Sequence, residues 1–148
     1  MSHDSARFAY QEMEASGSSG VQLVVMLYDG AIRFLNDASN SVRQRDLQGK
    51  IVAVDRALAI IGELQGTLRM EEGGEIAKSL DTLYTYMTNR ILDGSMKLDA
   101  RPFDEVVKLL TTLNGAWKTI AQSKVTPDAS GQSPTPGGDR SAPLEVFG

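Results

Sequence analysis

Apolar residues recur at spacings of three and four along most of this chain, which is the pattern of amphipathic α-helices. Short polar or glycine-rich stretches separate four such runs, and short connections favour antiparallel neighbours. We therefore expect an all-α protein, an antiparallel up-down four-helix bundle with a short N-terminal arm and a disordered C-terminal tail. The predicted helices run from Ser18 or Ser19 to about Arg45, from about Leu47 to Arg69, from Ile76 to Leu98, and from Pro102 to Ile120.

Composition divides the chain into three regions. Residues 1–20 form a mixed arm, residues 21–123 contain all the periodic apolar positions, and residues 124–148 hold four of the five prolines with Gly, Ser and Asp. The last region has too few apolar residues to offset the entropy of ordering, so it is predicted to be a disordered tail. The boundaries of the bundle domain are thus placed at 21 and 123.

The first predicted helix has more apolar surface than a bundle helix needs. Its polar residues fall on one narrow stripe, whereas an apolar stripe only somewhat wider than about 100° is enough to face a core. Two explanations stay open: the helix lies centrally and touches all its neighbours, or part of its surface lines a groove. Such a groove would accept a partner or the chain's own N-terminal arm. The apolar residues concerned are Val21, Leu23, Val24, Val25, Met26, Leu27, Tyr28, Ala31, Ile32, Phe34 and Leu35.

The side chains needed for most catalysis are missing from the sequence. The chain has no cysteine and one histidine, His3, which excludes Ser-His-Asp and Cys-His catalysis and thiolate metal sites. No glycine-rich stretch has the spacing of a phosphate-binding loop. We therefore expect no enzyme activity, no cofactor and no bound metal.

Charge and hydropathy narrow the possible partners and the location. The net charge is −4 without a basic cluster, so nucleic acid is not an expected partner. No stretch approaches the roughly 20 apolar residues that span a bilayer, and the first nine residues do not form a secretory signal. The expectation is a cytoplasmic protein without membrane insertion.

The sequence also predicts the surroundings of three single residues inside the helices. Gly94 falls between Ile91 and Leu98 on the apolar face, where a glycine permits close helix approach. Gly30 lies at the edge of the apolar arc of the first helix, where a helix or a ligand backbone could approach. Trp117 is assigned to the core.

Five short segments resemble the flagellar export chaperone family (FliS). They match in order from about Phe8 to Gln122, and their joint occurrence is specific. One departure is Ser19-Gly20, where the family often has a proline before the first helix. The segments are Ala9-Tyr10-Gln11, Met26-Leu27-Tyr28-Asp29-Gly30-Ala31, Gly73-Gly74-Glu75-Ile76-Ala77, Leu83-Tyr84-Thr85-Tyr86-Met87 and Ala116-Trp117-Lys118.

The resemblance implies a four-helix bundle that binds the disordered C-terminal segment of flagellin and delivers it to components of the flagellar export apparatus. It also implies that an N-terminal tyrosine, here Tyr10, covers an apolar groove before the client arrives. The free protein is expected to be a monomer or weak dimer. An alternative is a helical adaptor for another disordered client. The predicted client-binding residues are Tyr10, Val25, Met26, Tyr28, Gly30, Ile32 and Tyr86.

The tail carries one apolar cluster, Leu144, Val146 and Phe147, on which the family gives no guidance. One hypothesis is a short docking motif for the client groove or for a second export component. The other is a terminal remnant without a role.

Overall fold

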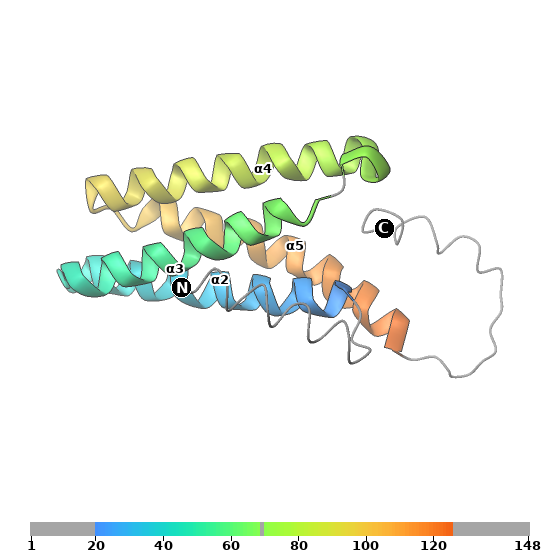
Figure 1. The fold of residues 1–148 in the computed structure, drawn as a ribbon. Coiled ribbons are helices and arrows are strands. Elements are labelled where there is room, and N and C mark those ends of the chain that lie inside the picture. The colour runs from blue at the N-terminus through green and yellow to red at the C-terminus, as the bar shows by residue number, and fades with distance from the viewer. Residues whose placement is uncertain (1–19, 69, 126–148) are drawn as a thin grey trace.

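Four α-helices make up the part of the chain that the computed structural model describes, residues 20–68 and 70–125. The helices are α2 (Gly20–Arg43), α3 (Leu47–Gly66), α4 (Met70–Lys97) and α5 (Arg101–Val125), and they run up and down in turn (Figure 1). The all-α four-helix bundle is therefore confirmed. Tyr10, nearly all of the predicted arm and most of the predicted tail lie outside the described residues.

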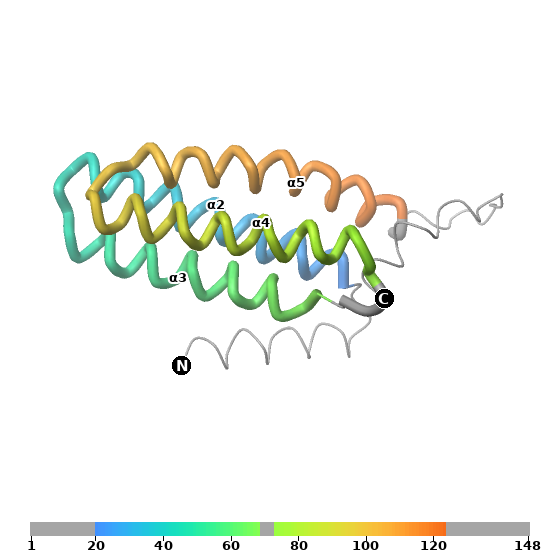
Figure 2. Tube along the Cα trace, turned by 90° about the horizontal axis from the view of Figure 1, so that it is seen from above, coloured from blue at the N-terminus to red at the C-terminus, as the bar shows by residue number. Residues whose placement is uncertain are grey.

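The helices form a ring in which α2 packs against α3 and α5, and α4 packs against the same two helices from the other side (Figure 2). α2 and α4 are thus diagonal neighbours. Their side chains still meet in the core, where the hydroxyl groups of Tyr28 and Tyr84 share a hydrogen bond of 2.6 Å. Helix α2 consequently has protein on three sides.

The centre of the core is an aromatic cluster. The ring of Tyr28 packs edge-on against Tyr84 and Trp117, with centroid distances of 6.5 and 6.3 Å. Burial raises the pKa of the Tyr28 hydroxyl and that of the Tyr84 hydroxyl above their ordinary value. The prediction that Trp117 belongs to the core is confirmed.

Two tight turns at one end of the bundle have the same construction. Shortly after the end of the helix, one residue adopts a left-handed conformation. This residue is Arg45 after α2, with φ 61°, and Leu98 after α4, with φ 52°. The next residue is an aspartate, Asp46 or Asp99, whose amide donates to a carbonyl five residues back. Each aspartate side chain then accepts a hydrogen bond from a backbone amide of the following helix, Gly49 or Arg101, at 3.0 Å.

The turn between α4 and α5 shows that the expectation for Leu98 was wrong. The sequence pattern placed Leu98 on the core face of the third helix, but α4 ends at Lys97 and the Leu98 side chain is exposed. A left-handed residue points its side chain away from the face that the preceding helix defines, so the helical period no longer applies to it.

Glycines position two chain segments. Gly74 interrupts α4 with φ 56° and ψ −130°, within the stretch where the sequence predicts a break in the pattern. At Gly94 an added Cβ would lie 2.8 Å from the carbonyl oxygen of Asp99 and 3.1 Å from the ring of Phe103. The predicted close approach at Gly94 is confirmed, and the approaching segment is the turn that leads into α5.

Candidate functional site

The surplus apolar surface of α2 is mostly covered by the bundle. The side chains of Val25 and Ile32 are half-buried and pack against the core. They share a flank of α2 with Asp29, which accepts a hydrogen bond from Asn114 of α5 at 2.8 Å, so this flank faces α5. Of the large apolar residues on α2, Met26 alone is exposed, at 51%. The central position of α2 therefore accounts for most of the surplus.

The structure separates the other predicted client-binding residues. Tyr28 is completely buried and offers no surface to a partner in this arrangement. At Gly30 the approaching group is Ile60 of α3, whose Cδ1 atom would lie 3.1 Å from an added Cβ. Tyr86 lies on α4, where its hydroxyl donates a hydrogen bond to Glu105 of α5. The predicted residues that the structure describes therefore do not come together in one groove.

Exposed large apolar side chains lie on both α3 and α4. Those of α4 are Ile76, Tyr86, Leu92 and Met96, and those of α3 lie beside two hollows of the surface. Leu47 and Ile51 belong to the three-four series of apolar residues that a helix in a bundle turns toward the core, yet they are 54% and 53% exposed. Val52 is exposed beside them. An available signal was that α3 has apolar residues on nearly every side, because Val52, Ala59 and Ile60 lie outside the three-four series.

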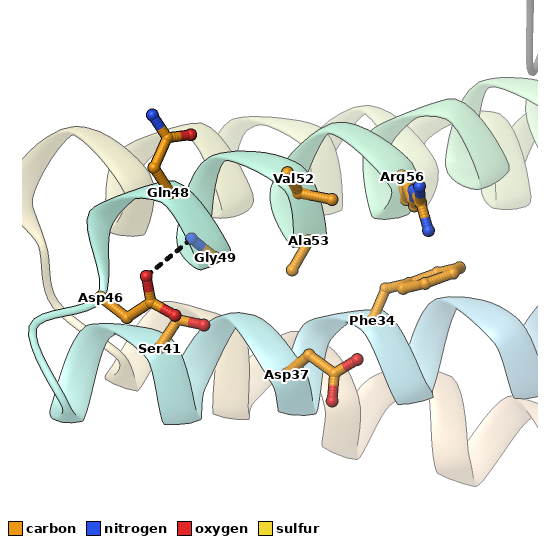
Figure 3. A pocket seen from close by; sticks show the side chains of 9 residues that line it. All are labelled: Phe34, Asp37, Ser41, Asp46, Gln48, Gly49, Val52, Ala53 and Arg56. Atoms are coloured by element: carbon orange, nitrogen blue, oxygen red, sulfur yellow. Dashed lines mark hydrogen bonds between the residues drawn. The ribbon is translucent and has the colours of Figure 1, made fainter.

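We call the outward side of this helix the α3 surface and define it by two adjoining hollows. The first, of about 480 Å³, lies along the seam with α2 (Figure 3). The second, of about 690 Å³, lies along the outer side of α3. Val52 and Arg56 line both hollows, so the two form one continuous surface. Other lining residues are Phe34, Gly49 and Ala53 in the first hollow, and Ile51, Leu58, Ala59 and Gly62 in the second.

Polar and charged groups line the α3 surface together with apolar residues, and they include Ser41 and Gln48 of the first hollow. The guanidinium groups of Arg33 and Arg56 lie over the Phe34 ring, 4.8 and 5.7 Å from its centroid. Asp37 and Asp46 line the first hollow and Asp55 lines the second. This arrangement suits apolar side chains of a partner. The described residues contain no group of three or more histidine, cysteine or carboxylate side chains that could hold a metal ion.

The seam between α4 and α5 has the opposite character. Arg90 donates to Glu105 at 2.8 Å and to Asp93 at 3.0 Å. The hydrogen bonds from Tyr86 and Arg90 hold the pKa of the Glu105 carboxyl below its usual value. The polar groups on this seam pair with one another.

None of the described helices is both long and apolar enough to cross a membrane. This finding comes from residues 20–68 and 70–125 alone.

Comparisons with known proteins point to one family. Residues 2–124 match the model of a family described as flagellar protein FliS. The chain is 39% identical over 111 residues to a flagellar secretion chaperone FliS of Salmonella typhimurium, covering 74% of this chain and 82% of the relative. It is 35% identical over 109 residues to that of Vibrio cholerae, covering 74% and 80%, and 32% identical over 120 residues to that of Campylobacter jejuni, covering 81% and 94%.

Proposed function

The chain belongs to the FliS family of flagellar proteins, and on that premise we propose that it is a cytoplasmic export chaperone for flagellin. It binds the disordered C-terminal segment of flagellin, prevents premature polymerisation and delivers flagellin to the flagellar type III export apparatus. It acts without a cofactor and without catalysis. The names of its relatives, which are flagellar secretion chaperones, support the coarse part of this proposal.

The observation that carries the proposal is the exposed apolar surface on α3. A helix that is apolar on nearly all sides is normally buried, yet Ile51 and Val52 face outward. Contiguous apolar surface of this kind marks a site that a partner covers. We therefore place the client on the α3 surface, with the exposed Met26 of α2 as a further client-binding residue.

A disordered client suits this surface physically. The two hollows are open to solvent and share Val52 and Arg56, so one segment can place successive apolar side chains in them. The segment loses conformational entropy when it orders on the helix, and the apolar burial offsets that loss.

The test is binding of a flagellin C-terminal peptide to the full chain and to Ile51→Asp. We expect the substitution to weaken binding at least tenfold, because it places a charge in the apolar contact. Ile76→Asp is the matched control, since Ile76 and Ile51 are the same residue type and both are 53% exposed. Met26→Asp tests the contribution of α2 in the same assay.

Circular dichroism of each variant separates lost binding from lost folding. If Ile51→Asp and Ile76→Asp weaken binding equally, the client does not bind at the α3 surface. If the unaltered chain retains no flagellin peptide but retains another disordered protein through Ile51, the adaptor alternative replaces this proposal.

A further inference from the structure

We propose that residues Pro143–Gly148 of this chain occupy the α3 surface when no client is bound, so that the protein carries its own competitor at its C-terminal end. The effect on client binding rests on the proposed function. The docking itself does not, because it involves this chain alone.

The composition of the tail singles out this segment. Residues 126–142 contain no Leu, Ile, Val, Met, Phe, Tyr or Trp, whereas Leu144, Val146 and Phe147 follow within four positions. In an extended chain Leu144 and Val146 point to one side, about 6.6 Å apart. The two hollows adjoin, since Val52 and Arg56 line both, so one short apolar segment can contact both at once.

The dimensions of segment and surface agree. The α3 surface extends from Gln48 to Gly62, a rise of about 21 Å along a helix. Six extended residues span about 20 Å. Residues 143–148 can therefore cover the surface once along its length.

The intervening chain is long enough for the segment to reach α3. α5 ends at Val125, at the same end of the bundle as Gly66, the last residue of α3 (Figure 1). The distance across the bundle is two helix spacings, on the order of 20 Å. A random coil of the length of residues 126–142 has an end-to-end distance of about 21–25 Å. This match gives an effective concentration in the millimolar range.

The charges predict that the docking is weak. Asp37, Asp46 and Asp55 outnumber Arg56 around the hollows, and Glu145 adds a further negative charge to the segment. Attraction is therefore mainly apolar, with an intrinsic Kd in the millimolar range. Because Kd and effective concentration are similar, about half of the molecules hold the segment. The segment then weakens client binding about twofold.

The first experiment needs no client. Methyl NMR spectra of the full chain are compared with those of the full-length variant Leu144→Ser, Val146→Ser, Phe147→Ser. We expect the methyl signals of Ile51, Val52 and Leu58 to shift, while those of Ile76 stay in place. The control variant carries Asp128→Ser, Thr135→Ser and Arg140→Ser in the same tail and should leave all of these signals unchanged.

Other occupants give different results. A response of the α3 methyls to Phe8→Ser, Tyr10→Ser and Met13→Ser, with none to the tail variant, would assign the surface to the N-terminal arm. A response to dilution alone would assign it to a second copy of the chain. Either result overturns the proposal, as do identical spectra for all variants.

The second experiment measures the Kd of the flagellin peptide for the same proteins. The triple tail variant should bind the peptide about twofold more tightly than the full chain. The control variant should bind it with the same Kd as the full chain. If the methyls shift but no peptide binds to any variant, the docking stands and the proposed client is wrong. If the peptide binds to the full chain and to all variants with the same Kd, the segment does not compete with the peptide.

Discussion

Helices α2 and α3 pack side by side, and both have more apolar residues than one core-facing side needs. The rest of the bundle covers more of this excess on α2 than on α3. α2 has α3 on one flank, α5 on the other and Tyr84 of α4 across the core, so most of its apolar residues are covered. α3 has α2 and α4 as neighbours, and its outward side keeps Ile51 and Val52 exposed. The same excess therefore stabilises the fold in one helix and leaves a binding surface on the other.

The difference shows that apolar excess by itself does not identify a binding surface. The excess must be compared with the share of it that the neighbouring helices cover. Substitutions at matched positions of the two helices test this distinction.

The largest difference is expected between Leu35 of α2, which is fully buried, and Ile51 of α3. Leu35→Ala removes side-chain contacts inside the core and should lower the free energy of unfolding by about 2–5 kcal/mol. Ile51→Ala should change it by much less, about 0.5 kcal/mol, because Ile51 is already 53% exposed. Urea denaturation of both variants measures the difference, and similar losses would mean that α3 is as central as α2.

A smaller effect is expected from the contact that joins α2 to α4. Tyr28→Phe leaves the buried hydroxyl of Tyr84 without its hydrogen-bond partner and should cost about 1–3 kcal/mol of unfolding free energy. Replacing both tyrosines with phenylalanine removes the unpaired group as well. The double variant should therefore lose less unfolding free energy than the two single variants lose together. Losses that simply add would contradict a direct hydrogen bond between the two hydroxyl groups.

The same pair predicts a loss of stability at alkaline pH. The folded-state pKa of each hydroxyl is raised above 10.0 because burial disfavours the phenolate. The unfolded chain therefore loses these protons first, and stability that is present below about pH 10 decreases above it. Urea titrations from pH 8 to 11 should show a weaker decrease for the double phenylalanine variant than for the unaltered chain.

The smallest effects are expected at one glycine in each helix. An added Cβ at Gly62 of α3 meets nothing within 4 Å, so Gly62→Ala should raise the unfolding free energy by up to about 1 kcal/mol. At Gly30 of α2 the Cδ1 atom of Ile60 would have to move from 3.1 Å. Gly30→Ala should therefore raise the unfolding free energy by less than Gly62→Ala does, or lower it. A larger increase for Gly30→Ala than for Gly62→Ala would contradict the comparison.

Sequence patterns identified the helices because helical periodicity and turn chemistry are local properties. The four runs, the break near Gly74 and the position of Pro102 in the first turn of α5 all follow from neighbours along the chain. Gly94 and Trp117 were also placed correctly, since each lies in line with periodic apolar residues of its own helix.

The candidate site could not be predicted to the same degree. Ile51 continues the three-four series of its helix, and nothing local distinguishes it from Ile61, which is completely buried. Tyr28 lies in a helix with apolar residues on several sides, and the sequence does not say which of those sides the bundle closes. Exposure at both positions depends on helices that are distant along the chain.

The sequence by itself therefore determined the element types, their order and the absence of the usual catalytic side chains. Tertiary structure decided which apolar surface remains open, because burial requires a neighbour and only the arrangement of all four helices supplies one. That arrangement covers α2 on three sides and leaves the outer side of α3 exposed.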